Sequence, residues 1–354
     1  MAGDVESVSL FVPGRLCLFG EHCDWAGEYG RHPGYCLVVG TDQGLSALAR
    51  PAQEFLVETL IPDDRGRPTG RKRRMSCPAD AATLARAARD QDEFFRYCAG
   101  TAHELHARGG RGLDLRIVGM DLPLRKGVSS SAAVCILVAR AFNEVYRLGL
   151  FPRELMEAAY RGEKLTGSQC GRMDQACIYG KTPVLLTFSR GDVRVEPLTP
   201  AGEVDLFFVD LAGRKDTLQI LSDLQQAYGD SAELQQALGP DNEAILRQAH
   251  QAISRGEAET IVRLMTEAQA LFDAKVAPHS PVQLASPLLH ELLAFEPIAE
   301  HIFGGKGVGS QGDGTAQFVA RSAADRNEAM RKIAGAFPAM RCFPLTLRAA
   351  AGGR

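Results

Sequence analysis

Short apolar runs separated by turns fill the first half of the chain and predict strands, because such runs suit a buried or half-buried pleated surface. The runs lie at residues 9–12, 16–19, 35–39, 45–48 and 113–118. A helix is expected from about residue 92 to 107, and residues 62–76 form a polar stretch between the predicted strands.

After residue 127 the spacing of the apolar positions changes to that of a helix. The residues on this helical face are Val134, Leu137, Val138, Ala141, Val145 and Leu148. They predict a helix that begins at a run of serines and is closed by Gly149. Pro152 suits the first turn of a second helix, which carries Glu163 on its apolar stripe. A carboxylate in that position needs a partner, either a bound cation or an internal salt bridge.

The second half of the chain is richer in helices. Runs at 184–188 and 193–198 predict a hairpin, and a domain boundary is expected near residue 200, which divides the chain into domains 1–200 and 201–354. Beyond it, amphipathic stretches lie near 216–229, 242–254, 257–275 and 322–336, and strands near 204–210, 315–320 and 342–348. The pattern is typical of a two-domain α+β protein.

Composition and charge exclude several classes of protein. Apolar residues make up 45% and charged residues 23% of the 354 positions, as in an ordinary globular protein. The net charge of -3 argues against a nucleic-acid partner. The basic run 71–74 is interpreted as a solvated loop, with a phosphate-binding patch as the alternative. No apolar run is long enough for a membrane span and the first residues are acidic, so a cytoplasmic location without a membrane partner is expected. Nine cysteines without metal-ligand spacing indicate small core residues in a reducing compartment.

A run of serines at the start of the first predicted helix is a candidate phosphate site. Residues 127–132 read Gly-Val-Ser-Ser-Ser-Ala. Backbone N–H groups at a helix start lack intrahelical partners and favour an anion. The alternative is a simple helix cap, for which one serine is enough. No Walker A sequence occurs in the chain.

Two further stretches concentrate polar or small residues. Arg15, Glu21, His22 and Asp24 crowd between apolar strand residues, where they could line a hydroxyl-binding pocket or form a polar turn with one satisfied histidine. Residues 303–315 are dense in glycine and run into a predicted strand. Because a strand rather than a helix follows, the GxGxxG spacing at 307–312 is a weak match to a dinucleotide fingerprint.

In the order in which they occur along the chain, the three stretches resemble the three motifs of the GHMP kinases. The N-terminal stretch, from Arg15 to Trp25, resembles the galactokinase signature Arg-x-x-x-x-Gly-Glu-His-x-Asp followed by an aromatic residue. Residues 170–175 resemble the Gly-x-Met-Asp-Gln segment of the same family. The family fold that this implies pairs an N-terminal domain like the second domain of ribosomal protein S5 with a C-terminal ferredoxin-like domain.

The resemblance implies a role for each matching residue. Asp174 would be the catalytic base, with Arg15 beside it, and Ser131 and Glu163 would hold Mg²⁺. Glu21, His22, Asp24 and Gly171 would bind the acceptor. ATP would be bound by Lys126, Gly127, Val128, Ser129, Ser130, Ser131 and Ala132.

The implied activity is ATP-dependent phosphorylation of a hydroxyl of a small sugar or polyol, including the anomeric hydroxyl, by a monomer or homodimer. The alternatives are a non-catalytic sensor of ATP and sugar, and a kinase for a non-sugar alcohol such as mevalonate. The sequence departs from galactokinases at Arg125-Lys126, which replace two glycines, at Ser310, Gln311 and Asp313 in the third stretch, and in a short insertion at 28–34.

Overall fold

The computed structural model describes residues 7–62, 68–122 and 129–348 of the chain. They divide into two compact units, each built from separate stretches of sequence. The first unit comprises residues 1–15 and 40–180, and the second comprises 16–39 and 181–354. The expected division at residue 200 stays a prediction.

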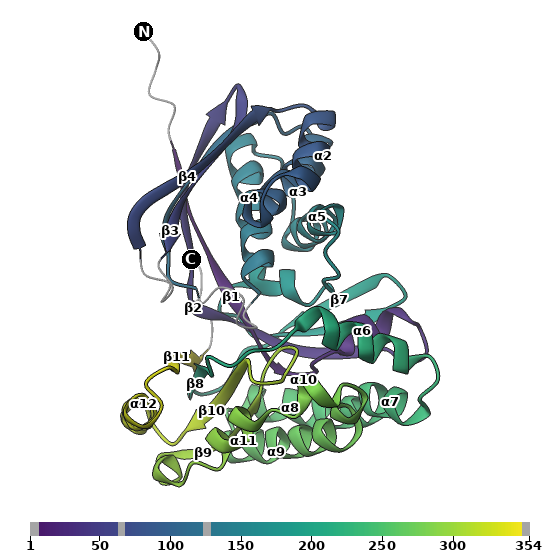
Figure 1. Ribbon diagram of the computed structural model, residues 1–354, viewed down its shortest axis with the longest axis vertical. Helices are drawn as coiled ribbons and strands as arrows, with labels where there is room; N and C mark the ends of the chain where they lie inside the picture. Colours follow the sequence, from purple (N-terminus) through teal and green to yellow (C-terminus); the bar gives the residue numbers. More distant parts are fainter. Residues whose placement is uncertain (1–6, 63–67, 123–128, 349–354) are drawn as a thin grey trace. The chain divides into compact units, whose positions relative to one another are not determined.

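The first unit combines a twisted sheet with four α-helices. Its elements are β1 (Val8–Phe19) up to Arg15, β2 (Gly34–Ala52) from Gly40, β3 (Glu54–Pro62), β4 (Pro68–Pro78), α2 (Ala81–Asp90), α3 (Glu93–His106), β5 (Gly112–Met120), α4 (Ser130–Tyr146), α5 (Pro152–Leu165) and the 3-10 helix η1 (Asp174–Tyr179). The strands lie in the order β4-β3-β5-β2, with β3 and β5 parallel. Helices α2 to α5 gather on one side of these strands (Figure 1).

The strands of the first half are longer than the sequence pattern predicts. The separate runs 9–12 and 16–19 belong to one strand, β1, and the runs 35–39 and 45–48 belong to β2. Extended backbone continues through Gly40, where a side chain would lie 2.2 Å from the carbonyl oxygen of Gly180. Glycine therefore allows a close approach at this point instead of ending the strand.

The basic run 71–74 lies on strand β4 and does not form the loop that the sequence suggested. Lys72 and Arg73 pair in register with Leu60 and Thr59 of β3. Lys72 forms an ion pair of 2.7 Å with Glu58. β4 is an edge strand of the sheet and residues 71–74 are all exposed, so its charges are tolerated and conceal it from a hydrophobicity pattern.

Helices α3 and α5 approach each other through glycine. A side chain at Gly100 would lie 2.2 Å from the carbonyl oxygen of Gly162, and one at Gly162 would lie 2.5 Å from Thr101. This close contact brings Glu163, the next residue on α5, into the interior, where its exposure is 1%.

The second unit contains a four-stranded antiparallel sheet in the order β11-β8-β10-β9. This order and the βαββαβ succession of elements are those of a ferredoxin-like domain, as the sequence resemblance implied. Its elements are α1 (Cys23–Glu28), β6 (Val184–Ser189), β7 (Asp192–Pro197), β8 (Val204–Asp210), α6 (Thr217–Tyr228), α7 (Ala232–Gln236), the π-helix η2 (Ala237–Asp241), α8 (Asn242–Arg255), α9 (Ala258–Lys275), η3 (Ala277–His279), α10 (Pro281–Leu284), α11 (Pro287–Leu293), η4 (Glu296–Ile298), β9 (Ile302–Gly307), β10 (Thr315–Ala320), α12 (Ala323–Ala336) and β11 (Arg341–Leu347), with the first parts of β2 and the last part of β1.

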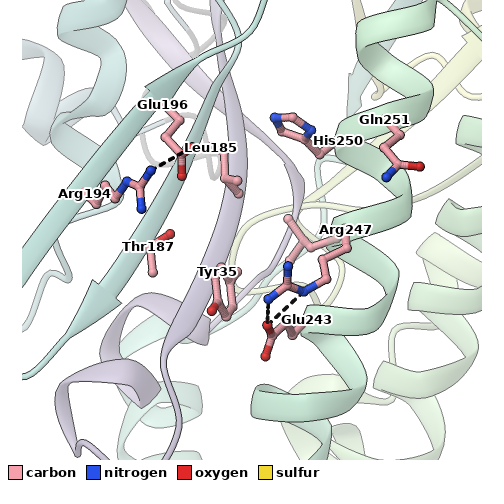
Figure 2. Close-up of a pocket in the computed structure, with 10 residues that line it drawn as sticks. Tyr35, Leu185, Thr187, Arg194, Glu196, Glu243, Arg247, His250 and Gln251 are labelled. Carbon is pink, nitrogen blue, oxygen red and sulfur yellow. Dashed lines mark hydrogen bonds and ion pairs between the residues drawn. The ribbon is translucent and has the colours of Figure 1, made fainter.

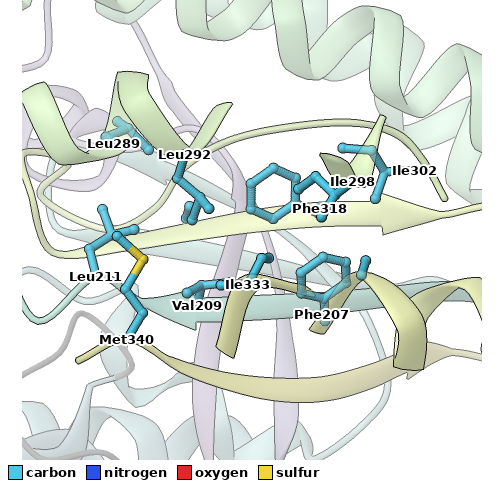
Figure 3. Packing of buried hydrophobic residues seen from close by; sticks show 12 residues of the cluster. Phe207, Val209, Leu211, Leu289, Leu292, Ile298, Ile302, Phe318, Ile333 and Met340 are labelled. Carbon is cyan, nitrogen blue, oxygen red and sulfur yellow. The ribbon is translucent and has the colours of Figure 1, made fainter. Parts of the chain in front are cut away.

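One face of this sheet forms the main hydrophobic core of the unit. Phe207 on β8 and Phe318 on β10 stack with ring centroids 5.1 Å apart. Leu289 from α11 and Ile333 from α12 close over them, as Figure 3 shows. Side chains alternate between the two faces along each strand, so Gln317, the neighbour of Phe318 on β10, lies on the opposite face.

All nine cysteines are free thiols, and most are buried, as expected of small core residues. Among the helices of the described residues, none is long and apolar enough to cross a membrane.

Candidate active site

The first unit joins two predicted site residues that are far apart in sequence. Arg15, which is 3% exposed on β1, forms an ion pair with Asp174 at the start of η1. The two residues are 159 positions apart. Gly171 lies in the irregular segment that precedes η1. The structure therefore places a guanidinium group against the predicted catalytic carboxylate.

Glu163 lies next to this pair in the interior of the same unit. The side-chain amide of Gln175 donates a hydrogen bond of 2.8 Å to Glu163 Oε2. Burial raises the pKa of Glu163 to about 7, and the charge of Asp174 acts in the same direction. Hydrogen bonds from Ser131, Gln175 and Ser168 lower the pKa. Glu163 is thus a buried carboxylate beside a second carboxylate, an arrangement that a bound cation would stabilise.

The donor set around Glu163 fits Mg²⁺. Carboxylate and hydroxyl oxygens from Glu163 and Ser131 are hard ligands of the kind that Mg²⁺ prefers. Within the described residues, no group of three or more His, Cys, Asp or Glu side chains could hold a metal ion. Mg²⁺ commonly takes only one or two protein ligands and completes its shell with phosphate oxygens and water, so two protein ligands are enough.

The serine run forms the start of α4. Ser129 is the N-cap residue with a left-handed φ of 57°, and its side chain makes no capping hydrogen bond. The simple cap that was the alternative for this run is therefore not formed by Ser129. Ser130, Ser131 and Ala132 occupy the first turn, where backbone N–H groups point out of the helix. Lys126, Gly127 and Val128 lie outside the described residues.

In the second unit, residues 20–22 connect β1 to α1, whose first two residues are Cys23 and Asp24. We call residues 20–24 the 20–24 turn. Gly20 has φ 92°, and a side chain there would lie 2.1 Å from the carbonyl oxygen of Tyr35, so only glycine fits. His22 also has a positive φ, of 67°. Glu21, His22 and Asp24 are all at most 6% exposed. The turn therefore places three polar side chains in a buried setting.

His22 is held as a neutral hydrogen-bond donor. Its Nδ1 accepts a hydrogen bond of 3.1 Å from Trp25 Nε1, and an indole N–H can only donate. Burial lowers the pKa of His22 to about 4, and the positive charge of Lys215 acts in the same direction. A hydrogen bond with the backbone of Ser310 opposes this decrease in pKa. The proton of the neutral ring is consequently on Nε2.

This histidine is expected to make the protein less stable in acid. Folded His22 stays neutral down to about pH 4, whereas in the unfolded chain it takes up a proton near pH 6.5. The contribution of neutral His22 to the free energy of unfolding is complete above pH 6.5 and is lost as the pH falls to about 4. The loss in this free energy is at most about 3 kcal/mol. In urea unfolding across this pH range, His22→Asn, which keeps an acceptor for Trp25, should lose less stability than the unaltered protein. The exposed His290→Asn is the control, and parallel curves for all three proteins would contradict the assignment.

In the glycine-rich stretch 303–315, the residues that depart from the family pattern form hydrogen bonds with neighbouring segments. Lys215 Nζ donates to Ser310 Oγ at 2.8 Å and to the carbonyl oxygen of Gln311 at 2.9 Å. Asp313 Oδ1 accepts a hydrogen bond of 3.0 Å from the backbone of Leu289. These hydrogen bonds connect the loop between β9 and β10 to Lys215 and to the backbone of α11.

Lys306 is a residue of this region that the sequence reasoning missed. It is 0% exposed and forms an ion pair with Glu21 of the 20–24 turn. Its Nζ also donates to the carbonyl oxygen of Gly307 at 2.7 Å. Nothing in the glycine-rich pattern indicated this pair, although a lysine inside a buried strand is itself a rare signal.

A separate cavity of about 450 Å³ lies in the second unit. Figure 2 shows Tyr35, Thr187 and Arg194 on strands facing Glu243 and Arg247 on α8. No residue that the sequence singled out lines this cavity. Its arginines pair with neighbouring glutamates, Arg194 with Glu196 and Arg247 with Glu243.

Residues 96–181 match the family model described as the GHMP kinases N terminal domain. Among curated proteins, the galactokinase of Roseiflexus sp. (strain RS-1) is 28% identical over 200 residues, which cover 55% of this chain and 46% of that protein. The galactokinase of Chloroflexus aurantiacus is 31% identical over 168 residues, covering 46% and 38%. The matched region thus spans less than half the length of these relatives.

Solved structures extend the likeness in fold to nearly the whole chain. The mevalonate kinase of L. major, in complex with R-mevalonate, has a TM-score of 0.74 at 18% identity and covers 99% of both chains. The galactokinase of Lactococcus lactis, in complex with galactose, has a TM-score of 0.72 at 17% identity and covers 99% of this chain and 96% of its own. The two-domain α+β fold is that of the GHMP kinases. The match of residues 96–181 to the GHMP kinase N-terminal domain confirms the resemblance of the sequence to this family.

Proposed function

We propose that this protein is an ATP-dependent kinase that phosphorylates a hydroxyl group of a small sugar or polyol. The observation that carries the proposal is the cluster of Arg15, Asp174, Glu163 and Ser131 in the first unit. Phosphoryl transfer requires an aligned acceptor hydroxyl and compensation of negative charge, and this cluster offers groups for both tasks. The sugar as acceptor rests on the galactokinase motif at residues 15–25 and on the galactokinase relatives.

In this mechanism Asp174 accepts or orients the proton of the attacking hydroxyl. Arg15, paired with Asp174, fixes the position of that carboxylate and stabilises negative charge that develops at the transferred group. Backbone N–H groups at the start of α4, over residues 129–132, bind phosphate oxygens of ATP. Ser131 and Glu163 would hold Mg²⁺, which when bound supplies charge neutralisation for the phosphates.

The proposed contacts to the acceptor are Glu21, His22, Asp24 and Gly171. A neutral His22 offers its Nε2–H to an acceptor oxygen, while a carboxylate at Asp24 accepts from sugar hydroxyls. A cytoplasmic location and a monomeric or homodimeric state complete the proposal.

A coupled ADP-release screen tests the function. The panel contains neutral sugars, uronic acids and inositol-type polyols, with R-mevalonate and homoserine as non-sugar alcohols, and NMR of the product identifies the phosphorylated oxygen. Sugar-dependent ADP release supports the proposal. Release with R-mevalonate alone assigns a non-sugar alcohol, and tight binding of ATP and sugar without any ADP release assigns a sensor.

Replacing Asp24 with alanine is expected to act mainly on the acceptor. Removing a carboxylate that accepts hydrogen bonds from substrate hydroxyls should raise KM for the sugar by about tenfold or more, with a smaller change in KM for ATP. Steady-state kinetics with each substrate varied in turn gives both constants. An unchanged sugar KM would remove Asp24 from the acceptor site.

A further inference from the structure

The face of the ferredoxin-like sheet that lies opposite its hydrophobic core carries buried polar side chains, among them Lys306 and Gln317. Lys306 on β9 and Gln317 on β10 are cross-strand partners, and both are 0% exposed. Their neighbour Phe318 points to the hydrophobic face. Burying a lysine and a glutamine side by side costs free energy unless each has specific partners, so these partners define what the two residues do.

Both side chains bind the segment that leads into the 20–24 turn. The amide of Gln317 donates hydrogen bonds to the backbone carbonyl oxygens of Cys17 and Leu18, at 3.0 and 3.2 Å. Lys306 reaches the Glu21 carboxylate three residues further along. The sheet therefore binds the last part of β1 through backbone hydrogen bonds and binds the 20–24 turn through one ion pair.

Lys306 is itself fixed from the other side. The carbonyl oxygen of Gly307 accepts a second hydrogen bond from its ammonium group. The backbone N–H of Gly307 donates to Gln269 Oε1 on α9 at 2.8 Å. The ammonium group consequently lies at a position set by two secondary-structure elements, β9 and α9.

Stability alone does not explain why the chain keeps this ion pair. A buried pair contributes little compared with apolar side chains of similar volume, because each charge must be removed from water. What the pair opposes is displacement of the carboxylate, because moving Glu21 away from Lys306 would leave two buried charges without compensation. The position that it fixes is that of His22 and Asp24, one and three residues beyond Glu21.

We propose that Lys306 is a positioning residue for the 20–24 turn, acting through Glu21 to set the geometry of the acceptor site. The inference rests on the proposed function for the identity of the site, whereas the coupling between Lys306 and the turn can be tested without turnover. It also explains why a lysine stands in a glycine-rich segment, which backbone flexibility alone does not.

Trp25 provides a direct reporter of the turn. It is the only tryptophan of the chain, it follows the turn immediately, and it binds the His22 ring and packs against Tyr228 with centroids 5.4 Å apart. A displaced turn exposes the buried indole to water, which moves its fluorescence emission to longer wavelength. Titration with D-galactose, followed by the same emission, measures binding of the probe without catalysis.

The experiment is a double-mutant cycle with Lys306→Met, Glu21→Gln and the double variant. Each single change should shift Trp25 emission in the folded protein and raise the apparent Kd and KM for D-galactose by about tenfold or more, with KM for ATP within about twofold. In the Glu21→Gln background, Lys306→Met should add little, because the lysine acts through that carboxylate. Lys72→Met and Glu58→Gln, which alter an exposed ion pair, are the matched controls and should change neither readout.

Several outcomes would overturn the proposal. One is a Glu21→Gln protein whose Trp25 emission, Kd and KM for D-galactose equal those of the unaltered protein. Because glutamine is nearly isosteric with glutamate, this result would be decisive even if the Lys306→Met protein does not fold. Another is a cycle in which the two effects simply multiply, which would make Lys306 independent of Glu21. If the unaltered protein neither binds nor phosphorylates galactose or another sugar, the proposed function fails, while the emission cycle still decides the role of Lys306.

Discussion

Replacing Asp174 with asparagine is expected to lower kcat by about 10²-fold or more, the usual contribution of a positioned acid or base. Asparagine keeps the size of the side chain but cannot take a proton or form the ion pair with Arg15. Single-turnover kinetics with the best acceptor of the screen measures the chemical step, and titration with an ATP analogue should show nearly unchanged nucleotide affinity.

A buried aspartate elsewhere in the first unit separates loss of catalysis from loss of stability. Asp114 is 5% exposed and pairs with Arg50 and Arg116 in the same unit. Asp114→Asn should cost stability in urea unfolding but leave kcat of the folded protein unchanged. A folded Asp174→Asn protein with near-normal turnover would show that Asp174 is not the base.

Glu163→Gln is expected to weaken Mg²⁺ binding by about 10²-fold or more, because the change removes the only charged protein ligand that we assign to the ion. Glutamine can keep hydrogen bonds with Ser131 and Gln175, so the interior should retain its packing. In the absence of metal, the variant should be at least as stable as the unaltered protein, since burying a neutral amide costs less than burying a carboxylate.

Calorimetric titration with Mg²⁺ in the presence of a non-hydrolysable ATP analogue measures this affinity without turnover. The control is Glu144→Gln, an exposed glutamate of α4 that pairs with Arg140. Equal Mg²⁺ affinities in the two variants would assign Glu163 to an internal polar network instead of a metal site.

The regular helices of the second half could be predicted closely from the sequence. The expected stretches 242–254, 257–275 and 322–336 correspond to α8, α9 and α12 within a residue or two at each end. Their apolar positions repeat with helical spacing over several turns, and a glycine or serine lies near one end of each helix. The spacing and the end signals therefore predict the same helix boundaries. Strand β4 was missed because a charged strand with few apolar residues has neither signal. Its partner β3 was missed although its Phe55 and Val57 are apolar and buried.

The candidate site was predictable only in part. Arg15 and Asp174 are distant in sequence, and no local pattern links them; the motif resemblance did so before the structure showed their contact. The pair of Lys306 and Glu21 joins residues 285 positions apart, and no motif names the lysine. Long-range pairs of this kind depend on tertiary packing, which periodicity does not encode. The roles of these residues stay predictions.

The interleaved order of the two units has a consequence for synthesis on the ribosome. Residues 16–39 belong to the second unit, yet they emerge before nearly all of the first unit and long before residue 181. A fragment that begins at residue 181 would contain Lys306 but not the glutamate that neutralises it. The second unit therefore cannot complete its fold until its C-terminal strands have left the exit tunnel, and neither unit can be excised as one contiguous segment. Separating them requires circular permutation or a covalently linked copy of residues 16–39.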